Sequence, residues 1–161
     1  AVKMRGKNGC MAYREGEQVK SRAKLGFAMK DIIDNLPGAF IVYRADKEND
    51  EILLANSELL RLTGCKNMDE LLAYTGKSFC NLIRPDEQES CQKSIWSQIN
   101  GGHSNNYIFF HMRKADGTYI SVLDHGRIVD SVHNGRVFYV IIMDLKSLQR
   151  HFGDCLKLVE K

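Results

Sequence analysis

The sequence R-V-F-Y-V-I-I-M, from Arg136 to Met143, runs straight into Asp144 and a stretch of helical spacing, with no loop between them. It is rich in β-branched and aromatic residues and follows Gly135, which predicts a strand buried on at least one face. Asp144 suits a helix N-cap, because its carboxylate can accept hydrogen bonds from the first free helix amides. A sheet that ends in an exiting helix can transmit a structural change, which is typical of a sensor or adaptor.

The segment after Asp144 carries a single apolar stripe. Its members recur at steps of three and four residues: Leu145, Leu148, Phe152, Cys155 and Val159. This spacing predicts one helical face, either the seam of a coiled coil or the side of a helix docked on its own sheet. A second amphipathic helix is expected over residues 17–35. Together the two terminal helices predict a homodimer, in which their apolar stripes pack on a partner chain.

The composition is that of one globular domain. The 161 residues are 43% hydrophobic and 27% charged, with a net charge of +3, and much of the basic excess lies before residue 31. We interpret this basic head as a solvated linker, since the rest of the chain is balanced in charge and no basic–aromatic stripe continues. No apolar run reaches the roughly 18 residues of a membrane span, and no signal peptide opens the chain. We therefore expect neither nucleic-acid nor membrane contacts.

Five cysteines are spread along the chain: Cys10, Cys65, Cys80, Cys91 and Cys155. Their odd number, their wide spacing and the lack of any C-x-x-C predict reduced thiols in a cytoplasmic setting. The histidines never stand at metal-binding spacing, so no metal site is expected. No catalytic pattern emerges either. Asp124 and His125 resemble an acid–base pair, but adjacent strand residues point to opposite faces. We expect no enzymatic activity in this segment.

The chain is expected to have four parts: a flexible tail over 1–16, an N-terminal helix or linker over 17–35, a folded domain over 36–145 and a signalling helix over 146–161. Within the folded domain we expect strands over 39–45, 51–55, 107–114, 118–129 and 136–143, and helices over 57–62, 68–74 and 85–99. A polar turn makes the first two strands a hairpin. Asp-Gly and Asn-Gly turns make the last three an antiparallel meander.

This order of elements resembles that of a PAS domain, and six short motifs resemble those of the family at matching points. They are L-P-G-A-F (36–40), I-L-L-A-N (52–56), L-L-R-L-T-G (59–64), L-I-R-P-D-E (82–87), R-K-A-D-G (113–117) and M-D-L (143–145). Arg84 stands where the family usually has histidine, and Ala115 where it usually has lysine. The resemblance covers residues 34–146. It implies an α+β PAS fold, a five-stranded antiparallel sheet with short helices and one longer helix packed on one face, flanked by N- and C-terminal helices.

The sequence also resembles PAS modules found beside GGDEF diguanylate cyclases, EAL phosphodiesterases and sensor histidine kinases in bacteria. That resemblance implies the sensory input module of a multidomain regulator in two-component or cyclic-di-GMP signalling. Such a module binds a small ligand or dimerises, and relays its signal to a covalently attached effector domain. Here the handover would run through Asp144, Leu145, Leu148 and Phe152. The alternative is a ligand-free interaction module that dimerises and sets the helix register of its neighbour.

The resemblance places a ligand pocket between the sheet and the long helix. The side chains expected to line it are Phe40, Val42, Phe79, Ile95, Trp96, Phe109, His111, Val122 and Tyr139. Because side chains alternate along a strand, a shift of one residue would exchange the whole set. A core filled by the same bulky side chains is the alternative, and the sequence leaves both open.

The cofactor is expected to be a small organic ligand or none. Haem-binding relatives often supply a histidine from the long helix, and residues 86–100 contain none. His111 and His125 lie on predicted strands, where a half-buried or solvent-facing role is favoured over ligation. Flavin-binding LOV domains carry G-x-N-C-R-F-L-Q, which residues 76–83 resemble only superficially. Cys80 is displaced by one position from the LOV cysteine, and we interpret it as a small core hydrophobe.

Overall fold

The computed structural model describes residues 26–153. The chain divides into two units, residues 1–35 and 36–161, which are described separately. In the first unit, α2 spans Met29–Asp34 and ends at Asn35. Within the described residues, the helix predicted over 17–35 begins only at Met29, because Gly26 adopts a φ of +87°, outside the helical region. Residues 17–25 of that helix, and the tail predicted over 1–16, lie outside the described residues.

The second unit contains every strand and helix that was predicted over residues 36–145. Its elements are β1 (Ala39–Arg44), β2 (Ile52–Ala55), α3 (Ser57–Thr63), α4 (Met68–Thr75), the 3-10 turns η1 (Phe79–Leu82) and η2 (Pro85–Glu87), α5 (Gln88–Asn100), β3 (Asn105–Arg113), β4 (Tyr119–Ser131), β5 (Gly135–Asp144) and α6 (Leu145–Phe152). The boundaries follow local chemistry. Asn56 and Asn67 cap α3 and α4 with their side chains, and Gly64 and Gly76 end those helices in the left-handed conformation.

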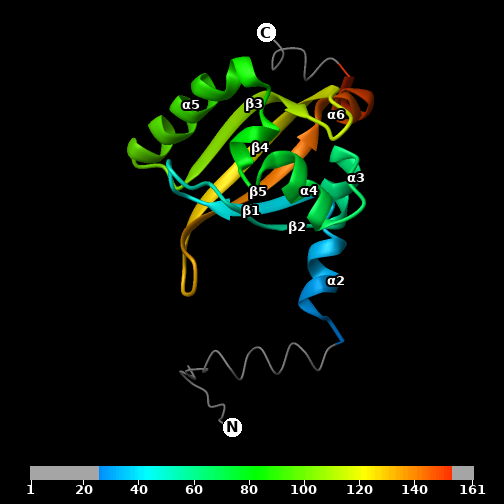
Figure 1. Ribbon diagram of the computed structural model, residues 1–161, viewed down its shortest axis with the longest axis horizontal. Helices are drawn as coiled ribbons and strands as arrows, with labels where there is room; N and C mark the ends of the chain where they lie inside the picture. The colour runs from blue at the N-terminus through cyan, green and yellow to red at the C-terminus, as the bar shows by residue number, and fades with distance from the viewer. Residues whose placement is uncertain (1–25, 154–161) are drawn as a thin grey trace. The chain divides into compact units, whose positions relative to one another are not determined.

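The five strands form one antiparallel sheet in the order β2-β1-β5-β4-β3 (Figure 1). The hairpin and the meander predicted from the turns are both present. The pairing of β1 with β5 joins them, running from Ala39 opposite Ile142 to Arg44 opposite Val137. This pairing places the last strand in the middle of the sheet. The predicted α+β fold with a five-stranded antiparallel sheet is confirmed.

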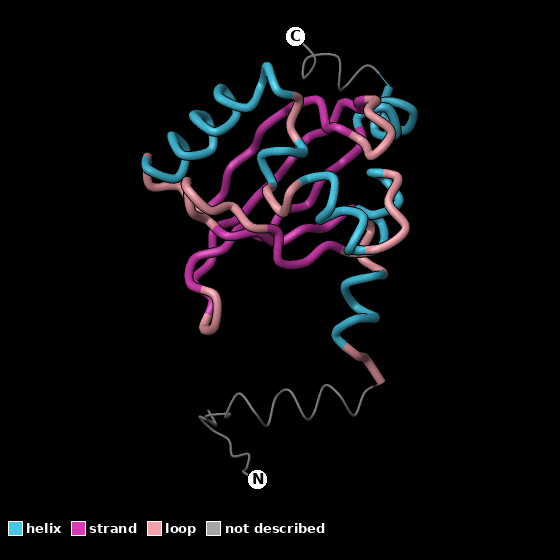
Figure 2. Tube along the Cα trace, in the orientation of Figure 1, coloured by secondary structure: helices cyan, strands magenta, loops and turns pink. Residues whose placement is uncertain are grey.

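The helices α3, α4 and α5 cover one face of the sheet, and the main core lies between them and the strands (Figure 2). Aromatic rings fill its centre. Tyr43 stacks on Phe79 at 4.0 Å between ring centroids and lies 5.2 Å from Phe138. Phe138 in turn meets the edge of Trp96 at 5.7 Å. Burial of such large rings is the main source of stability in this unit.

Side-chain hydrogen bonds join the long helix α5 to the edge strand β3 at two points. At its start, the Glu87 carboxylate accepts the backbone N–H of His111 at 2.9 Å and contacts the His111 ring Nδ1 at 2.6 Å. Near its end, the Gln98 side-chain amide donates to the carbonyl of Tyr107 at 3.0 Å and accepts its N–H at 2.9 Å. These contacts satisfy backbone groups that an open sheet edge would expose. They hold α5 over the inner face of the sheet, where the candidate site lies.

Candidate functional site

Four of the nine predicted pocket residues lie on the helix-covered side of the sheet. Phe79, Ile95 and Val122 are fully buried members of the core. Trp96 is half-buried and packs against that core from α5. The structure therefore brings these four side chains together in the core, and their role in lining a ligand pocket stays a prediction.

The facing predicted for the other five is wrong. Phe40, Val42, Phe109, His111 and Tyr139 lie on the opposite, outer face, because the buried positions of their strands are the alternate ones. On β1, for example, the burial alternates from Ala39, so the odd-numbered residues face the core. Both faces of these strands are apolar in sequence, so hydrophobic alternation alone did not fix the facing.

Two polar side chains lie on the inner face of the sheet, among the apolar ones. Asn106 on β3 and Asp124 on β4 are only 2% and 1% exposed. Asn106 pairs with Gly126, and Ile108 pairs with Asp124, so the two polar residues are diagonal neighbours on one face. The Asn106 Nδ2 and the Asp124 Oδ2 have no hydrogen-bond partner among residues 26–153. Sequence reasoning missed this pair, because each residue is unremarkable until the strand register joins them.

Gly126 leaves the space that the Asn106 side chain occupies. A Cβ atom at position 126 would stand 3.2 Å from both Nδ2 and Oδ1 of Asn106, and 3.3 Å from a methyl group of Val140. Such a contact is tighter than ordinary van der Waals packing. The glycine thus allows a polar amide to lie flat against β4 beside Asp124.

Burial dominates the electrostatics of Asp124. It raises the pKa of the Asp124 carboxyl well above its usual range. No salt bridge to Asp124 forms within the described part of the chain. Burial therefore favours the neutral form of this carboxyl. Asp124 is buried in the core, whereas His125 stacks on Tyr107 with 4.2 Å between ring centroids, so the two adjacent residues face opposite sides of the sheet, as predicted.

An open groove of about 630 Å³ runs beside α5. Its lining residues are Lys47, Asp50, Ser78, Cys80, Glu89, Gln92, Lys93, Trp96, Ser97 and Asn100. Within this lining, the Asp50 carboxylate accepts hydrogen bonds from the Ser78 hydroxyl at 2.7 Å and from the Cys80 N–H at 2.8 Å. The Lys47 ammonium lies over the Trp96 ring, 5.4 Å from its centroid. A volume of this size is in the range that holds small organic molecules.

The groove and the polar pair flank the same part of the core. Burial raises the pKa of Tyr43, and Asp124, Asp50 and Cys80 in their ionised forms would add to that rise. Burial raises the pKa of Cys91 to about 11, with further contributions from Glu87, Asp124 and Cys80. Asp124 and Cys80 therefore both lie within electrostatic range of Tyr43 and Cys91.

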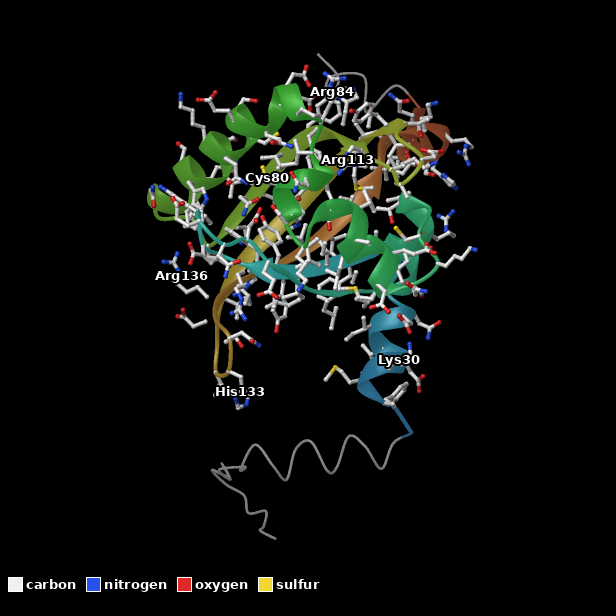
Figure 3. The ribbon with its side chains drawn as sticks, in the orientation of Figure 1. Lys30, Cys80, Arg84, Arg113, His133 and Arg136 are labelled. Atoms are coloured by element: carbon white, nitrogen blue, oxygen red, sulfur yellow. The ribbon has the colours of Figure 1, made fainter. Side chains whose placement is uncertain are left out.

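Cys80 lies below α5 in the view of Figure 3. Burial raises its thiol pKa, so the group stays protonated and weakly nucleophilic. Cys80, Cys65 and Cys91 are all free thiols. Cys10 and Cys155 lie outside the described residues.

The two strand histidines lie away from the inner face. His111 is held by Glu87, which also pairs with Arg84 at 2.6 Å. His125 is covered by the Tyr107 ring. Within residues 26–153 no group of three or more His, Cys, Asp and Glu side chains is arranged to hold a metal ion. No helix in that range is long and apolar enough to cross a membrane.

The exit from the sheet has the geometry that the sequence predicts. Asp144 caps α6, with its Oδ1 accepting the Lys146 N–H at 3.0 Å. Leu145 is buried, Leu148 is half-buried and Phe152 is exposed, so the stripe turns from the core towards solvent along the helix. Its later members, Cys155 and Val159, lie outside the described residues.

The sequence matches the family model of the PAS fold over residues 52–143, more than half of the chain. No curated protein sequence matches it significantly. Among solved structures it resembles the PAS domain of a two-component sensor histidine kinase, with 16% identity and a TM-score of 0.57, covering 79% of this chain and 99% of that one.

Two further solved structures show the same fold at low identity. One is a LOV protein from Rhodobacter sphaeroides, with 17% identity and a TM-score of 0.59, covering 82% of this chain and 69% of that one. The other is the PAS domain, in complex with ethanol, of a LuxR-family transcriptional regulator from Burkholderia thailandensis. It has 22% identity and a TM-score of 0.56, covering 74% of this chain and 99% of that one. With its family model matched and its fold shared by these domains, the chain belongs to the PAS family of sensory and signalling modules.

Proposed function

We propose that this PAS module is the sensory input domain of a bacterial multidomain regulator: a diguanylate cyclase, a cyclic-di-GMP phosphodiesterase or a sensor histidine kinase. It binds a small organic ligand on the inner face of its sheet. Binding changes the packing of the sheet, and helix α6 carries that change to an attached effector domain.

The position of β5 is the observation that carries this proposal. β5 is the middle strand, paired in register with β1 on one side and with β4 on the other. It contributes Phe138 and Val140 to the inner face and then enters α6 without a loop. Leu145, the first residue of α6, is 1% exposed, which anchors the start of the helix in the domain. A change beneath α5 therefore acts on a strand that is continuous with the exit helix.

Neighbouring residues on β5 provide a matched test of this relay. Phe138→Leu alters the inner face, whereas Tyr139→Leu alters the outer face with a similar loss of ring area. Amide hydrogen exchange is measured in α6 relative to α3 of the same molecule, so that a change in global stability cancels. We expect faster relative exchange of α6 in Phe138→Leu and no change in Tyr139→Leu. Equal behaviour of the two variants would contradict the relay.

Native mass spectrometry and an absorbance spectrum of the purified chain test the ligand part of the proposal. We expect a retained small organic molecule, or an addition when small probes are supplied, and no haem or flavin absorbance. A haem or flavin spectrum would replace the proposed ligand class.

The exposed end of α6 favours a second candidate, a ligand-free module that dimerises through its terminal helices. Phe152 is 60% exposed and continues the stripe that begins at Leu145 and Leu148. An exposed aromatic on such a stripe is typical of a helix that packs on a partner chain. Light scattering of Leu148→Glu tests this reading. If the native chain is a dimer and the variant is a folded monomer, the helix forms the interface; a native chain that is already monomeric removes this candidate.

A further inference from the structure

Among residues 26–153, five polar residues are buried, and they divide into two groups. Asn56, Thr63 and Thr75 each form side-chain hydrogen bonds to backbone groups. Asn106 and Asp124 each leave a fully buried polar atom without a partner in that range. An unsatisfied buried polar atom costs roughly 1–3 kcal/mol, and here two occur side by side. Their proximity makes them a pair rather than two separate defects.

Strand register fixes the pair in one place. Asn106 lies opposite Gly126 and Asp124 lies opposite Ile108, so both side chains project from the same face of adjacent strands. Because Gly126 has no Cβ, the Asn106 amide can lie close to the backbone of β4. Tyr43 from β1 and Cys91 from α5 lie within electrostatic range of Asp124. Burial raises the pKa of each of them, so both are neutral at pH 7.

The two free atoms define the chemistry that would satisfy them. The Asn106 Nδ2 offers an N–H donor. A neutral Asp124 carboxyl can donate through its O–H or accept through its carbonyl oxygen. A hydroxyl group or a primary amide carries both an acceptor and a donor, so one such group offers a matching partner for each of the two side chains. An ionic group fits less well, because burying a charge without a fixed counter-charge is expensive.

We propose that Asn106 and Asp124 anchor an interior site for a small uncharged ligand that carries a hydroxyl or primary amide group. This assignment rests on the proposed sensory function and specifies its ligand class. The ligand's polar group bonds to the pair, and its apolar part packs against the aromatic core that Tyr43, Phe79 and Phe138 form. The inner-face strand β5 lies next to β4, so the same site is placed to act on the exit helix.

Four probes with the same carbon chain test the ligand class: butan-1-ol, butyramide, butylammonium and butyrate. Their dissociation constants for the full chain are measured by ligand-observed NMR at pH 7. We expect the alcohol and the amide to bind with affinities at least about tenfold higher than those of the two ions. We expect Asp124→Leu, which keeps the branched shape but removes both oxygens, to weaken binding of the alcohol and the amide about tenfold.

Two further variants distinguish the loss of hydrogen bonds at Asp124 from the loss of an aspartate elsewhere on β4. Asp124→Asn stays uncharged and keeps hydrogen-bonding groups, so we expect it to retain alcohol and amide binding within about threefold. Asp130→Asn changes an exposed aspartate on the same strand and should leave every probe unaffected. Circular dichroism and urea unfolding of each variant show whether it is folded.

The outcomes distinguish this inference from the function on which it rests. Tightest binding of butylammonium, lost in Asp124→Asn, would show an ionised Asp124 and overturn the uncharged class while leaving a ligand-binding sensor intact. Probe binding that Asp124→Leu does not weaken would place the ligand elsewhere. If no probe binds and Asp124→Leu lowers the stability of the chain, the pair is a structural element, and the inference is overturned; the exchange test of α6 then decides the sensory function separately.

Discussion

Two regions of the core differ in whether their buried polar groups have hydrogen-bond partners. Beside α3, the Asn56 Oδ1 accepts the N–H groups of Phe40 and Leu59 at 2.9 and 3.0 Å, so one side chain joins β1 to a helix start. Beneath α5, Asn106 and Asp124 leave polar atoms without partners in the described part of the chain. The first arrangement stabilises the fold. The second costs stability, and proteins carry such a cost where function requires it.

The largest effect is expected where the polar group is satisfied. Asn56→Ala should lower the free energy of unfolding by about 3 kcal/mol, because two backbone N–H groups and the Gly38 carbonyl lose their partner in a buried setting. Asn67→Ala is the matched control. Asn67 caps α4 through a single bond to the Glu70 N–H in an exposed setting, so its loss should cost about 1 kcal/mol. Urea unfolding followed by circular dichroism measures both; equal costs would remove the distinction that burial makes here.

A smaller change in the free energy of unfolding, of opposite sign, is expected at the unpartnered pair of Asn106 and Asp124. Asp124→Leu should raise the free energy of unfolding of the ligand-free chain by about 1–2 kcal/mol, because it removes an unpartnered buried carboxyl and adds apolar contacts. Asp50→Leu should do the reverse, since Asp50 accepts hydrogen bonds from Ser78 and Cys80. A loss of stability in Asp124→Leu would mean that its carboxyl is satisfied in solution, and the contrast between the two regions would fail.

The contrast also predicts a dependence on pH. Burial raises the folded-state pKa of Asp124, so from about pH 4 upward the unfolded chain releases this proton while the folded chain keeps it. That difference lowers the stability of the native chain as the pH rises, until the folded carboxyl also ionises. Asp124→Asn has no such titration. Its stability relative to the native chain should therefore grow between pH 4 and pH 8 in urea unfolding, and parallel curves would show that burial does not govern this carboxyl.

The smallest effect is expected at Gly126. Gly126→Ala should change the free energy of unfolding by no more than about 0.5 kcal/mol, because the reduced freedom of the unfolded chain offsets the tight contact with Asn106. It should nevertheless displace the Asn106 amide, visible as a change in the NMR shifts of its side-chain NH₂ group. An unchanged amide would show that Asn106 is not held against β4.

Much of the fold was predictable because its signals are local. The side-chain caps at Asn56, Asn67 and Asp144 lie within a few residues of the amides that they bind. Gly117 and Gly135 adopt positive φ in the two turns of the meander, as the Asp-Gly and Asn-Gly pairs predict. The element order and the strand-to-helix junction followed from such features.

The site was predicted only in part. Phe79, Ile95, Trp96 and Val122 lie at the core as expected, whereas the strand residues Phe40 and Tyr139 proved to face outward. Both faces of these strands are apolar, so the period-two pattern gives no preference for either side. Asp124 entered the sequence reasoning only as a neighbour of His125, and nothing there linked it to Asn106.

Local sequence is therefore enough to predict the order of the strands and helices of residues 36–145 and their ends to within about three residues, because caps and turns are bonds between near neighbours. The pairing of β1 with β5 and the facing of each strand were decided only in the tertiary structure. So was the meeting of Asn106 with Asp124, which depends on the register of two strands closing over one shared core. Register and facing are properties of the whole sheet, and a strand that is apolar on both sides does not encode them by itself.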